Sequence, residues 1–329
     1  MSALLCNNRG MALLLTVLII SIIVVVTLQF NTAMRSDLQA AANLRDGVKL
    51  DFNARSALNL ARSVLQIDAS ESNVDTLQEN WAKLPELAAY ASAYLDEGRF
   101  ELEIADHSGR IQINALVYGA DETAIQLQRE ILARLLLSEE FGLDNEEVES
   151  IIDALIDWLD ADDEVTGFGG AENSYYQALE KPYSCRNGPV ESQEELLHVK
   201  GINRELFYGS GERPGLSMFV TAYGNDGKVN INTADPLVLQ ALAEPINKDL
   251  AEEMAAYRED EGSDLTAVNW YKNVPAFPGD IDIPAELLTV QSSYFEIRAR
   301  AYLGTMSRTV TGVIRRDADS TEIVSWKTD

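Results

Sequence analysis

The sequence predicts an α+β protein, in which a long N-terminal helix packs on an antiparallel sheet and a large helical segment is inserted into the chain. Three observations predict this class. Residues 11–30 are almost wholly apolar, strand-like alternation occurs on both sides of residue 200, and helical periodicity dominates residues 117–290. With 329 residues, the chain is long enough for two or three compact units.

The N-terminal helix is predicted from an apolar block and from the absence of helix breakers. Residues 11–30 would span about 30 Å as a helix, one hydrocarbon thickness. A cleaved secretory peptide fits less well, because no small-residue cleavage site follows Phe30. Proline is absent from Met11 to Leu84, so the helix can continue to about Gln66. Apolar residues recur there at steps of three and four, which predicts an amphipathic packing face: Leu38, Ala41, Leu44, Val48, Phe52, Leu58, Ala61 and Leu65.

Three β-hairpins are predicted from alternating apolar residues. The first joins RFELEIA to RIQINALV through DHSG, and the second lies in FVTAYGNDGKVNINTA. GRIQIN at Gly109 resembles GKVNIN at Gly227, and an aspartate precedes the apolar helix after each, which favours a repeated strand-then-helix unit (Asp121, Asp235). The third joins YFEIRARAYLG to MSRTVTGVIRR, with arginines facing outward: Arg298, Arg300, Arg308, Arg315 and Arg316.

Helices are predicted over residues 125–137, 146–159, 191–206 and 232–259, the last two each interrupted by a short break. This pattern resembles SAM-like or helix-hairpin-helix modules. In DNA-binding versions, hairpin glycines and nearby cations contact phosphate. Here VKGIN has one glycine and one lysine, EPIN has no glycine, and the net charge is −27. We therefore expect a protein-packing module and no nucleic-acid binding.

An acidic loop is the strongest candidate for a site. Fourteen acidic residues and no Lys or Arg lie between Leu135 and Glu180. In DWLDADDEVTGFGGAENSYY, carboxylates cluster at a helix end and a glycine-rich return brings back another. Calcium takes six to eight oxygen ligands on such flexible loops, whereas magnesium demands a small octahedral site. A solvated loop without metal is the alternative. The predicted ligands are Asp160, Asp162, Glu164 and Glu172, with Asp157 and Asp163 as weaker candidates.

No catalytic motif is found, so we expect no enzyme. The two histidines, His107 and His198, have no histidine or cysteine neighbours, and neither a P-loop nor a G-x-S-x-G sequence occurs. Cys6 precedes the apolar block and Cys185 lies in a polar loop, so we predict no intrachain disulfide.

The N-terminus resembles that of type IV pilins and type II secretion pseudopilins. In that family a peptidase cuts after a glycine and methylates the new N-terminus, which implies cleavage between Gly10 and Met11, after Arg9. Most members carry a glutamate at the fifth mature position, where this chain has Leu15. The missing glutamate and the helical insertion resemble the K family of minor pseudopilins, which is proposed to cap the filament tip. In that family the loop after D-W-[IL]-D is associated with calcium.

The resemblance implies a role in protein transport. The chain would be a single-pass inner-membrane protein with a cytoplasmic N-terminus and a periplasmic bulk, standing at the pseudopilus tip and priming its assembly. Implied partners are the minor pseudopilins I, J and H, the major pseudopilin and the prepilin peptidase, with secreted substrates and the secretin as further candidates. Two alternatives are a membrane-anchored helix-hairpin-helix DNA-binding protein and a calcium-dependent adhesin or hydrolase.

The predicted organisation has six segments. They are a leader (1–10), a transmembrane segment (11–30), the amphipathic helix with the first strands of a pilin-type sheet (31–116), the inserted helical domain with the acidic loop (117–216), a second strand-helix-hairpin-helix unit (217–290) and a C-terminal hairpin of the sheet (291–329).

Overall fold

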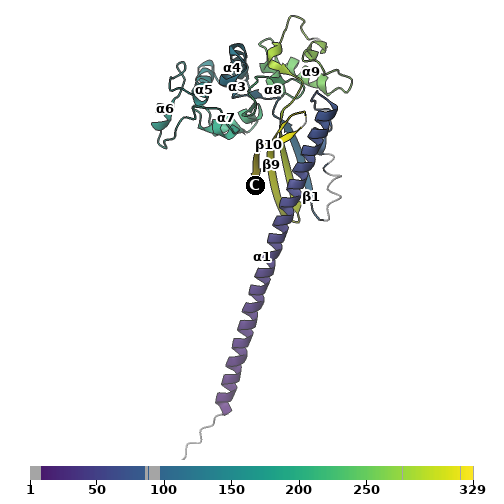
Figure 1. Ribbon diagram of the computed structural model, residues 1–329. Coiled ribbons are helices and arrows are strands. Elements are labelled where there is room, and N and C mark those ends of the chain that lie inside the picture. Colours follow the sequence, from purple (N-terminus) through teal and green to yellow (C-terminus); the bar gives the residue numbers. More distant parts are fainter. Residues whose placement is uncertain (1–8, 86–87, 89–96, 276, 319, 329) are drawn as a thin grey trace, which may run out of the picture.

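A computed structural model describes residues 9–85, 88, 97–275, 277–318 and 320–328. Its dominant feature is the helix α1 (Arg9–Glu71), a rod whose N-terminal half stands clear of the rest of the molecule (Figure 1). The predicted continuous helix is confirmed and extends to Glu71. No proline interrupts it, and hydroxyls such as Ser21 donate back to the carbonyl one turn earlier at 2.8 Å.

The packing face of α1 differs from the predicted one. Leu58, Ala61 and Leu65 are buried as expected, together with Leu50, Ala54 and Ala57. The N-terminal part of the predicted stripe is exposed: Leu38, Leu44, Val48 and Phe52 have exposed fractions from 49% to 71%. The prediction joined two different faces into one stripe. The sheet covers α1 only from about Leu50 onward, on the opposite side of the helix.

A four-stranded antiparallel sheet packs on the C-terminal half of α1. Its order is β1-β8-β9-β10, formed by β1 (Arg99–Asp106), β8 (Tyr294–Leu303), β9 (Met306–Arg316) and β10 (Thr321–Thr328). Alternate residues face α1, among them Phe100, Phe295, Ile297, Val310 and Ile314, and Trp81 closes this core against Phe295. The predicted β8–β9 hairpin is confirmed, whereas β10 was not predicted.

The first two predicted hairpins are wrong. β1 pairs with β8, far along the chain, while β2 (Ile111–Gln112) pairs in parallel with β5 (Val220–Thr221). β6 (Val229–Asn230) likewise pairs in parallel with β7 (Leu288–Thr289). Alternation identifies strands but not their partners, because many alternating segments in a chain can satisfy the same pattern.

The chain between β1 and β8 forms the helical part above the sheet (Figure 1). The predicted helices correspond to α4 (Glu122–Leu136), α5 (Asn145–Leu159), α8 (Pro236–Ala241) and α9 (Lys248–Glu259). The segment predicted to break at Gly201 divides into the 3₁₀ helix η1 (Gln193–His198) and α7 (Arg204–Tyr208). The remaining elements are short: α3 (Ala115–Tyr118), α6 (Asn173–Gln177), β3 (Gly209–Ser210), β4 (Arg213–Pro214), η2 (Leu216–Met218), η3 (Trp270–Asn273) and η4 (Ala285–Leu287).

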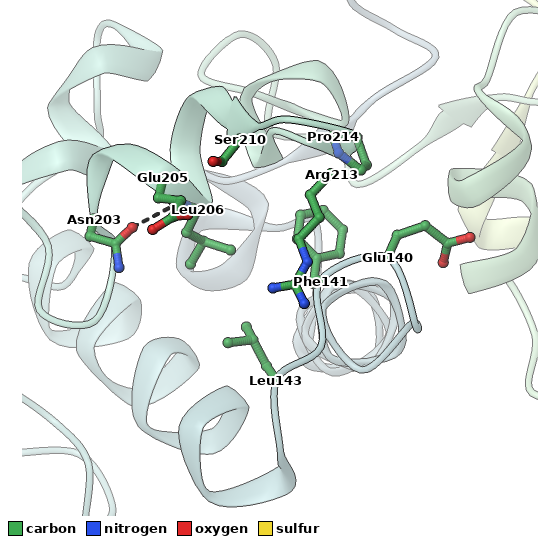
Figure 2. Close-up of a pocket in the computed structure, with 9 residues that line it drawn as sticks. All are labelled: Glu140, Phe141, Leu143, Asn203, Glu205, Leu206, Ser210, Arg213 and Pro214. Atoms are coloured by element: carbon green, nitrogen blue, oxygen red, sulfur yellow. Dashed lines mark hydrogen bonds between the residues drawn. The ribbon is translucent and has the colours of Figure 1, made fainter.

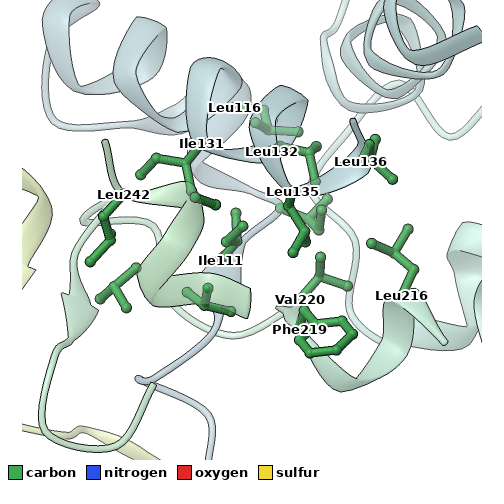
Figure 3. Packing of buried hydrophobic residues seen from close by; sticks show 14 of the residues in the cluster. Ile111, Leu116, Ile131, Leu132, Leu135, Leu136, Leu216, Phe219, Val220 and Leu242 are labelled. Carbon is green, nitrogen blue, oxygen red and sulfur yellow. The ribbon is translucent and has the colours of Figure 1, made fainter. Parts of the chain in front are cut away.

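One apolar core joins the predicted 117–216 and 217–290 segments. Figure 3 shows α4 side chains packed against residues from both, with Ile131 near Leu242 and Leu135 near Val220. The two copies of the predicted strand-then-helix unit have the same kind of N-cap on their helices. Asp121 accepts from the Ala124 amide at 2.9 Å to start α4, and Asp235 accepts from the Leu237 amide at 2.9 Å to start α8. Such caps satisfy helix amides that would otherwise lack partners.

A buried polar joint connects the sheet to the helical part. Arg316, predicted to face outward, is buried and donates to Asp68 at the end of α1 and to Asp75. Asp106 at the end of β1 accepts hydrogen bonds from Ser292 and Thr233, both at 2.5 Å. Buried polar groups require such partners. The joint therefore fixes the orientation of α1, the sheet and the insertion relative to one another.

Candidate metal centre and membrane helix

The acidic loop begins where α5 ends and is held by its own backbone. A capping box of Asp144 and Glu147 fixes the start of α5, and Asp160 is its C-cap. Gly167 has a φ of +55°, which favours glycine, and the Gly169 amide donates to Asp153 at 3.1 Å. The loop then returns to Glu172, the N-cap of α6. This return brings residues twelve apart in sequence to one place.

Three carboxylates meet in this loop. Oxygens of Asp160, Asp162 and Glu172 all lie within 4.8 Å of one another. Asp157, completely buried on α5, is part of the same electrostatic environment and accepts from the Thr166 amide at 2.9 Å through Oδ1. Asp157 Oδ2, Asp160 Oδ1 and Glu172 Oε1 are buried without a hydrogen-bond partner among the described residues.

The protonation equilibria show how unfavourable this arrangement is for a metal-free chain. Burial, with the charges of Asp162 and Asp157, raises the pKa of Asp160 to about 6. Burial and the charge of Asp157 raise the pKa of Glu172 to about 7. Like charges in a partly desolvated site disfavour ionisation unless a cation compensates them. The donor set is made of oxygens only, and its orphaned oxygens suit a hard cation such as calcium.

Only some of the predicted ligands come together in the loop. Asp160, Asp162 and Glu172 come together, with Asp157 beside them, while the exposed Glu164 and Asp163 lie outside the three-carboxylate cluster. Asn187 was not predicted as part of this site, and its side chain donates to the Asp162 carbonyl at 2.7 Å. Its φ of +47° and the following glycine mark a turn, but nothing in the sequence connects that turn to the loop.

A second acidic group is explained without a metal. Carboxylate oxygens of Asp68, Asp75 and Glu79 also lie within 4.8 Å of one another. There the Arg316 guanidinium already pairs with Asp68 and Asp75, and Glu79 accepts from the Trp81 indole at 3.0 Å. This group is a structural ion-pair network.

α1 carries the membrane-length segment. Within the described residues it is the one helix long and apolar enough to cross a bilayer, with a mean hydropathy of 3.1 over its most apolar window. Met11 and Leu15 are exposed on this segment, and a side chain at Gly10 would meet no atom of another part of the chain. Beyond residue 30, apolar side chains remain exposed on the face opposite the sheet, at Met34, Leu38, Val48 and Phe52.

A small cavity, a buried cysteine and a partly buried lysine lie elsewhere in the helical part. The pocket in Figure 2 is a cavity of about 130 Å³ lined by the loop between α4 and α5, by α7 and by the β3–β4 pair, and Arg213 extends into it. That volume is smaller than typical ligand sites. Cys185 is buried, which raises the pKa of its thiol to about 11, and Cys6 lies outside the described residues. Lys200, the lysine of VKGIN, donates to the Gly169 carbonyl at 2.8 Å. Its ammonium therefore helps to hold the acidic loop in place.

A membrane-length helix whose far half packs on an antiparallel sheet is a pilin-like architecture. Two sequence models of one family, described as type II secretion system protein K, match residues 109–209 and 229–291. The chain belongs to this type II secretion system protein K family.

The alignments with the relatives cover most of the chain. Type II secretion system protein K of Aeromonas hydrophila is 27% identical over 328 residues, covering 96% of this chain and 95% of the relative. The Pseudomonas aeruginosa protein of that name is 26% identical, covering 95% and 90%. A chain in the crystal structure of the GspK-GspI-GspJ complex from enterotoxigenic Escherichia coli shares the fold, with a TM-score of 0.72, 21% identity, and coverage of 88% of this chain and 99% of that one.

Proposed function

We propose that this chain is a minor pseudopilin of the type II secretion system that stands at the tip of the periplasmic pseudopilus and primes its assembly. The assembled fibre then serves the export of folded proteins through the outer membrane. The role is mechanical rather than catalytic. α1 anchors the chain in the inner membrane, with the N-terminus cytoplasmic and the sheet and helical part periplasmic.

The observation that carries this proposal is the apolar face of α1 that its own sheet leaves uncovered. Met34, Leu38, Val48 and Phe52 recur at helical spacing beyond the membrane segment, with exposed fractions of 49% to 66%. A monomeric protein would have no reason to keep such a stripe in water. The helices of neighbouring subunits would cover it, because a stripe continuous with a membrane segment suits helix–helix packing both in lipid and beyond it.

The tip position rests on Leu15 and on the shape of the head. Leu15 offers no carboxylate to neutralise the N-terminal amine of a subunit ahead of it. A subunit at the tip has no subunit ahead of it and therefore needs no such carboxylate. The helical part extends sideways beyond the sheet at the end of the molecule far from the membrane segment (Figure 1). A further subunit stacked ahead of this one would have to fit around that bulk.

The partners are other minor pseudopilins. The structural relative was solved in a complex named for three such proteins, GspK, GspI and GspJ. We assign the corresponding minor pseudopilins I and J as direct neighbours of this chain. The minor pseudopilin H and the major pseudopilin would follow in the fibre, the prepilin peptidase would process the precursor between Gly10 and Met11, and secreted substrates and the secretin would meet the tip.

The acidic loop would hold a structural calcium ion. Asp160, Asp162 and Glu172 would bind it, with Asp157 directly behind them. When bound, the cation would supply the positive charge that four close carboxylates lack. The chain's own residues would fix the loop, through the Asp157–Thr166 and Asp153–Gly169 hydrogen bonds. Support comes from the orphaned oxygens of Asp157, Asp160 and Glu172.

Crosslinking in living cells tests the proposed function. A photoreactive residue at Phe52, on the exposed stripe, is expected to capture the helix of another pseudopilin when the whole system is expressed. The matched control is Asn43, which is also exposed but lies two turns before Leu50 on the sheet-facing side. If neither position captures a pseudopilin and secretion proceeds in cells lacking this chain, the proposal fails.

A further inference from the structure

The last strand leaves one edge of the sheet open. β10 pairs with β9 on one side, and in the described part of the chain no strand pairs with its other side. Figure 1 shows it as the outermost strand, on the side of the sheet away from β1. An open edge presents a row of backbone N–H and C=O groups that can pair with another strand. The features around β10 decide whether this edge is guarded or available.

β10 carries fewer charged residues than the opposite edge strand of the sheet. Its eight residues include two charges, Glu322 and Lys327, and no proline, whereas β1 at the opposite end of the sheet carries four charges. Three large apolar side chains of β10 are 38% to 40% exposed: Ile323, Val324 and Trp326. A register shift between Ile323 and Ser325 leaves Val324 without a partner on β9. A half-exposed apolar strand with a free edge is a site for strand addition.

The strand is nevertheless held in place before any partner arrives. Arg62 of α1 donates to both the hydroxyl and the carbonyl of Thr321, each at 2.5 Å. Arg315 pairs with Glu322 at 2.8 Å, and the Arg55 guanidinium lies over the Trp326 ring at 5.4 Å. An edge fixed in its pairing geometry loses little conformational entropy when another strand joins it.

The open edge is also continuous with the uncovered face of α1. Val48, Arg55 and Arg62 follow one another at steps of seven, so they lie on one side of the helix. Arg55 and Arg62 contact β10, and Val48 belongs to the exposed apolar stripe. A subunit whose helix packs on that stripe would therefore carry its own folded part toward β10.

We propose that β10 is a docking edge to which a neighbouring pilin-like subunit adds a β-strand. The occupant is an extended segment of another protein with apolar residues at alternate positions, so that its backbone pairs with β10 and its side chains cover Ile323 and Trp326. This inference rests on the proposed function, because it specifies how one of the proposed partner proteins is bound.

Hydrogen exchange on the intact complex tests the proposal. The full chain in detergent is mixed with the full-length minor pseudopilins I and J of the same secretion system, and amide exchange is followed by mass spectrometry. Amides of residues 321–328 are expected to exchange at least about tenfold more slowly in the complex, as backbone hydrogen bonds form. Complex formation with unchanged exchange in β10 would overturn the docking edge and leave the proposed function standing.

A charge at the edge provides the matched test. Val324→Lys, at the residue without a β9 partner, is expected to weaken the complex about tenfold, because lysine is a natural guard of strand edges. Met218→Lys changes an exposed apolar residue in the helical part and is expected to leave affinity unchanged. Equal affinity of Val324→Lys and the parent would overturn the proposal. So would protection of β10 in the chain alone at high concentration, which would identify a second copy as the occupant. A parent chain that binds neither pseudopilin would remove the proposed function itself.

Discussion

The guanidinium of Arg316, at the end of β9, lies 2.9 Å from the carboxylate of Asp68, at the end of α1. The same guanidinium pairs with Asp75, in the segment after α1, and donates to the Ser292 carbonyl at 3.1 Å, so one side chain connects the rod, the sheet and the point where the chain returns from the insertion to β8. Force transmitted along α1 would reach the helical head through this joint. Its strength is therefore relevant to a mechanical role.

Arg316→Ala is expected to destabilise the chain by about 3–5 kcal/mol, because it leaves the buried Asp75 carboxylate without its cation. Chemical unfolding of the full chain in detergent, followed by tryptophan fluorescence, measures the loss. The neighbouring Arg315→Ala is the control. Arg315 pairs with the exposed Glu322, and such pairs contribute at most about 1 kcal/mol. Similar losses in the two variants would mean that the joint has no special role.

Asp160→Asn is expected to lower the melting temperature in calcium but not in chelator, because it removes one of the converging ligands. The control is Glu164→Gln, which changes an acid of the same loop that lies outside the three-carboxylate cluster. That variant should melt like the parent in both conditions. A loss for Asp160→Asn of the same size with and without calcium would contradict the metal centre.

The pH dependence has a definite sign. Raised pKa values of about 6 for Asp160 and about 7 for Glu172 mean that the folded, calcium-free chain binds these protons more tightly than the unfolded chain. Their contribution to stability is therefore greatest below about pH 4 and is lost as the pH rises to about 7. Calcium requires ionised ligands, so the gain in melting temperature on adding calcium should grow over the same interval.

Thermal melts at pH 5 and pH 8, each with calcium and with chelator, measure this effect. The double variant Asp160→Asn, Glu172→Gln separates these two groups from the other carboxylates of the chain. It should show the same melting temperature with and without calcium at both pH values. A calcium effect in the parent that is larger at pH 5 than at pH 8 would contradict the assignment of these pKa values to the binding site.

The sequence predicted those parts of the fold that depend on local pattern. The uninterrupted α1, the α5 helix and the β8–β9 hairpin follow from helical spacing, capping residues and a short turn. Strand pairing over long distances did not follow, because β1 and β8 are separated in the chain by the whole insertion and no local pattern identifies them as partners. β10 was missed although Ile323, Val324 and Trp326 favour a strand.

The candidate site was predicted in part for the same reason. Counting carboxylates identified the loop, but which of them converge depends on the turn at Gly167 and on the return to Glu172. Asp163 and Glu164 are near in sequence and lie outside the cluster, whereas Asn187 is distant in sequence and near in space. The burial of Arg316 likewise depended on Asp68 and Asp75, which no periodicity connects to β9.

Processing of the N-terminus is expected to leave Met11 as the first residue, with a methylated amine. Mass analysis of the chain extracted from membranes measures both features. Gly10→Val should abolish the cut, because the peptidase recognises a glycine at this position in the family that the leader resembles. Recovery of an intact Met1, or of a chain beginning after Phe30, would contradict processing of the pilin type.

Leu15→Glu tests the tip position directly. A carboxylate at this depth in lipid costs about 2.5–3.5 kcal/mol unless it is paired. In a subunit with a neighbour ahead, the neighbour's N-terminal amine would supply that pairing; at the tip, no amine is available. We therefore expect Leu15→Glu to reduce secretion as strongly as Leu18→Glu, which places the same charge one turn away, while Leu15→Ala is tolerated. If secretion survives Leu15→Glu but not Leu18→Glu, the new glutamate has found an amine, and the chain stands within the fibre rather than at its tip.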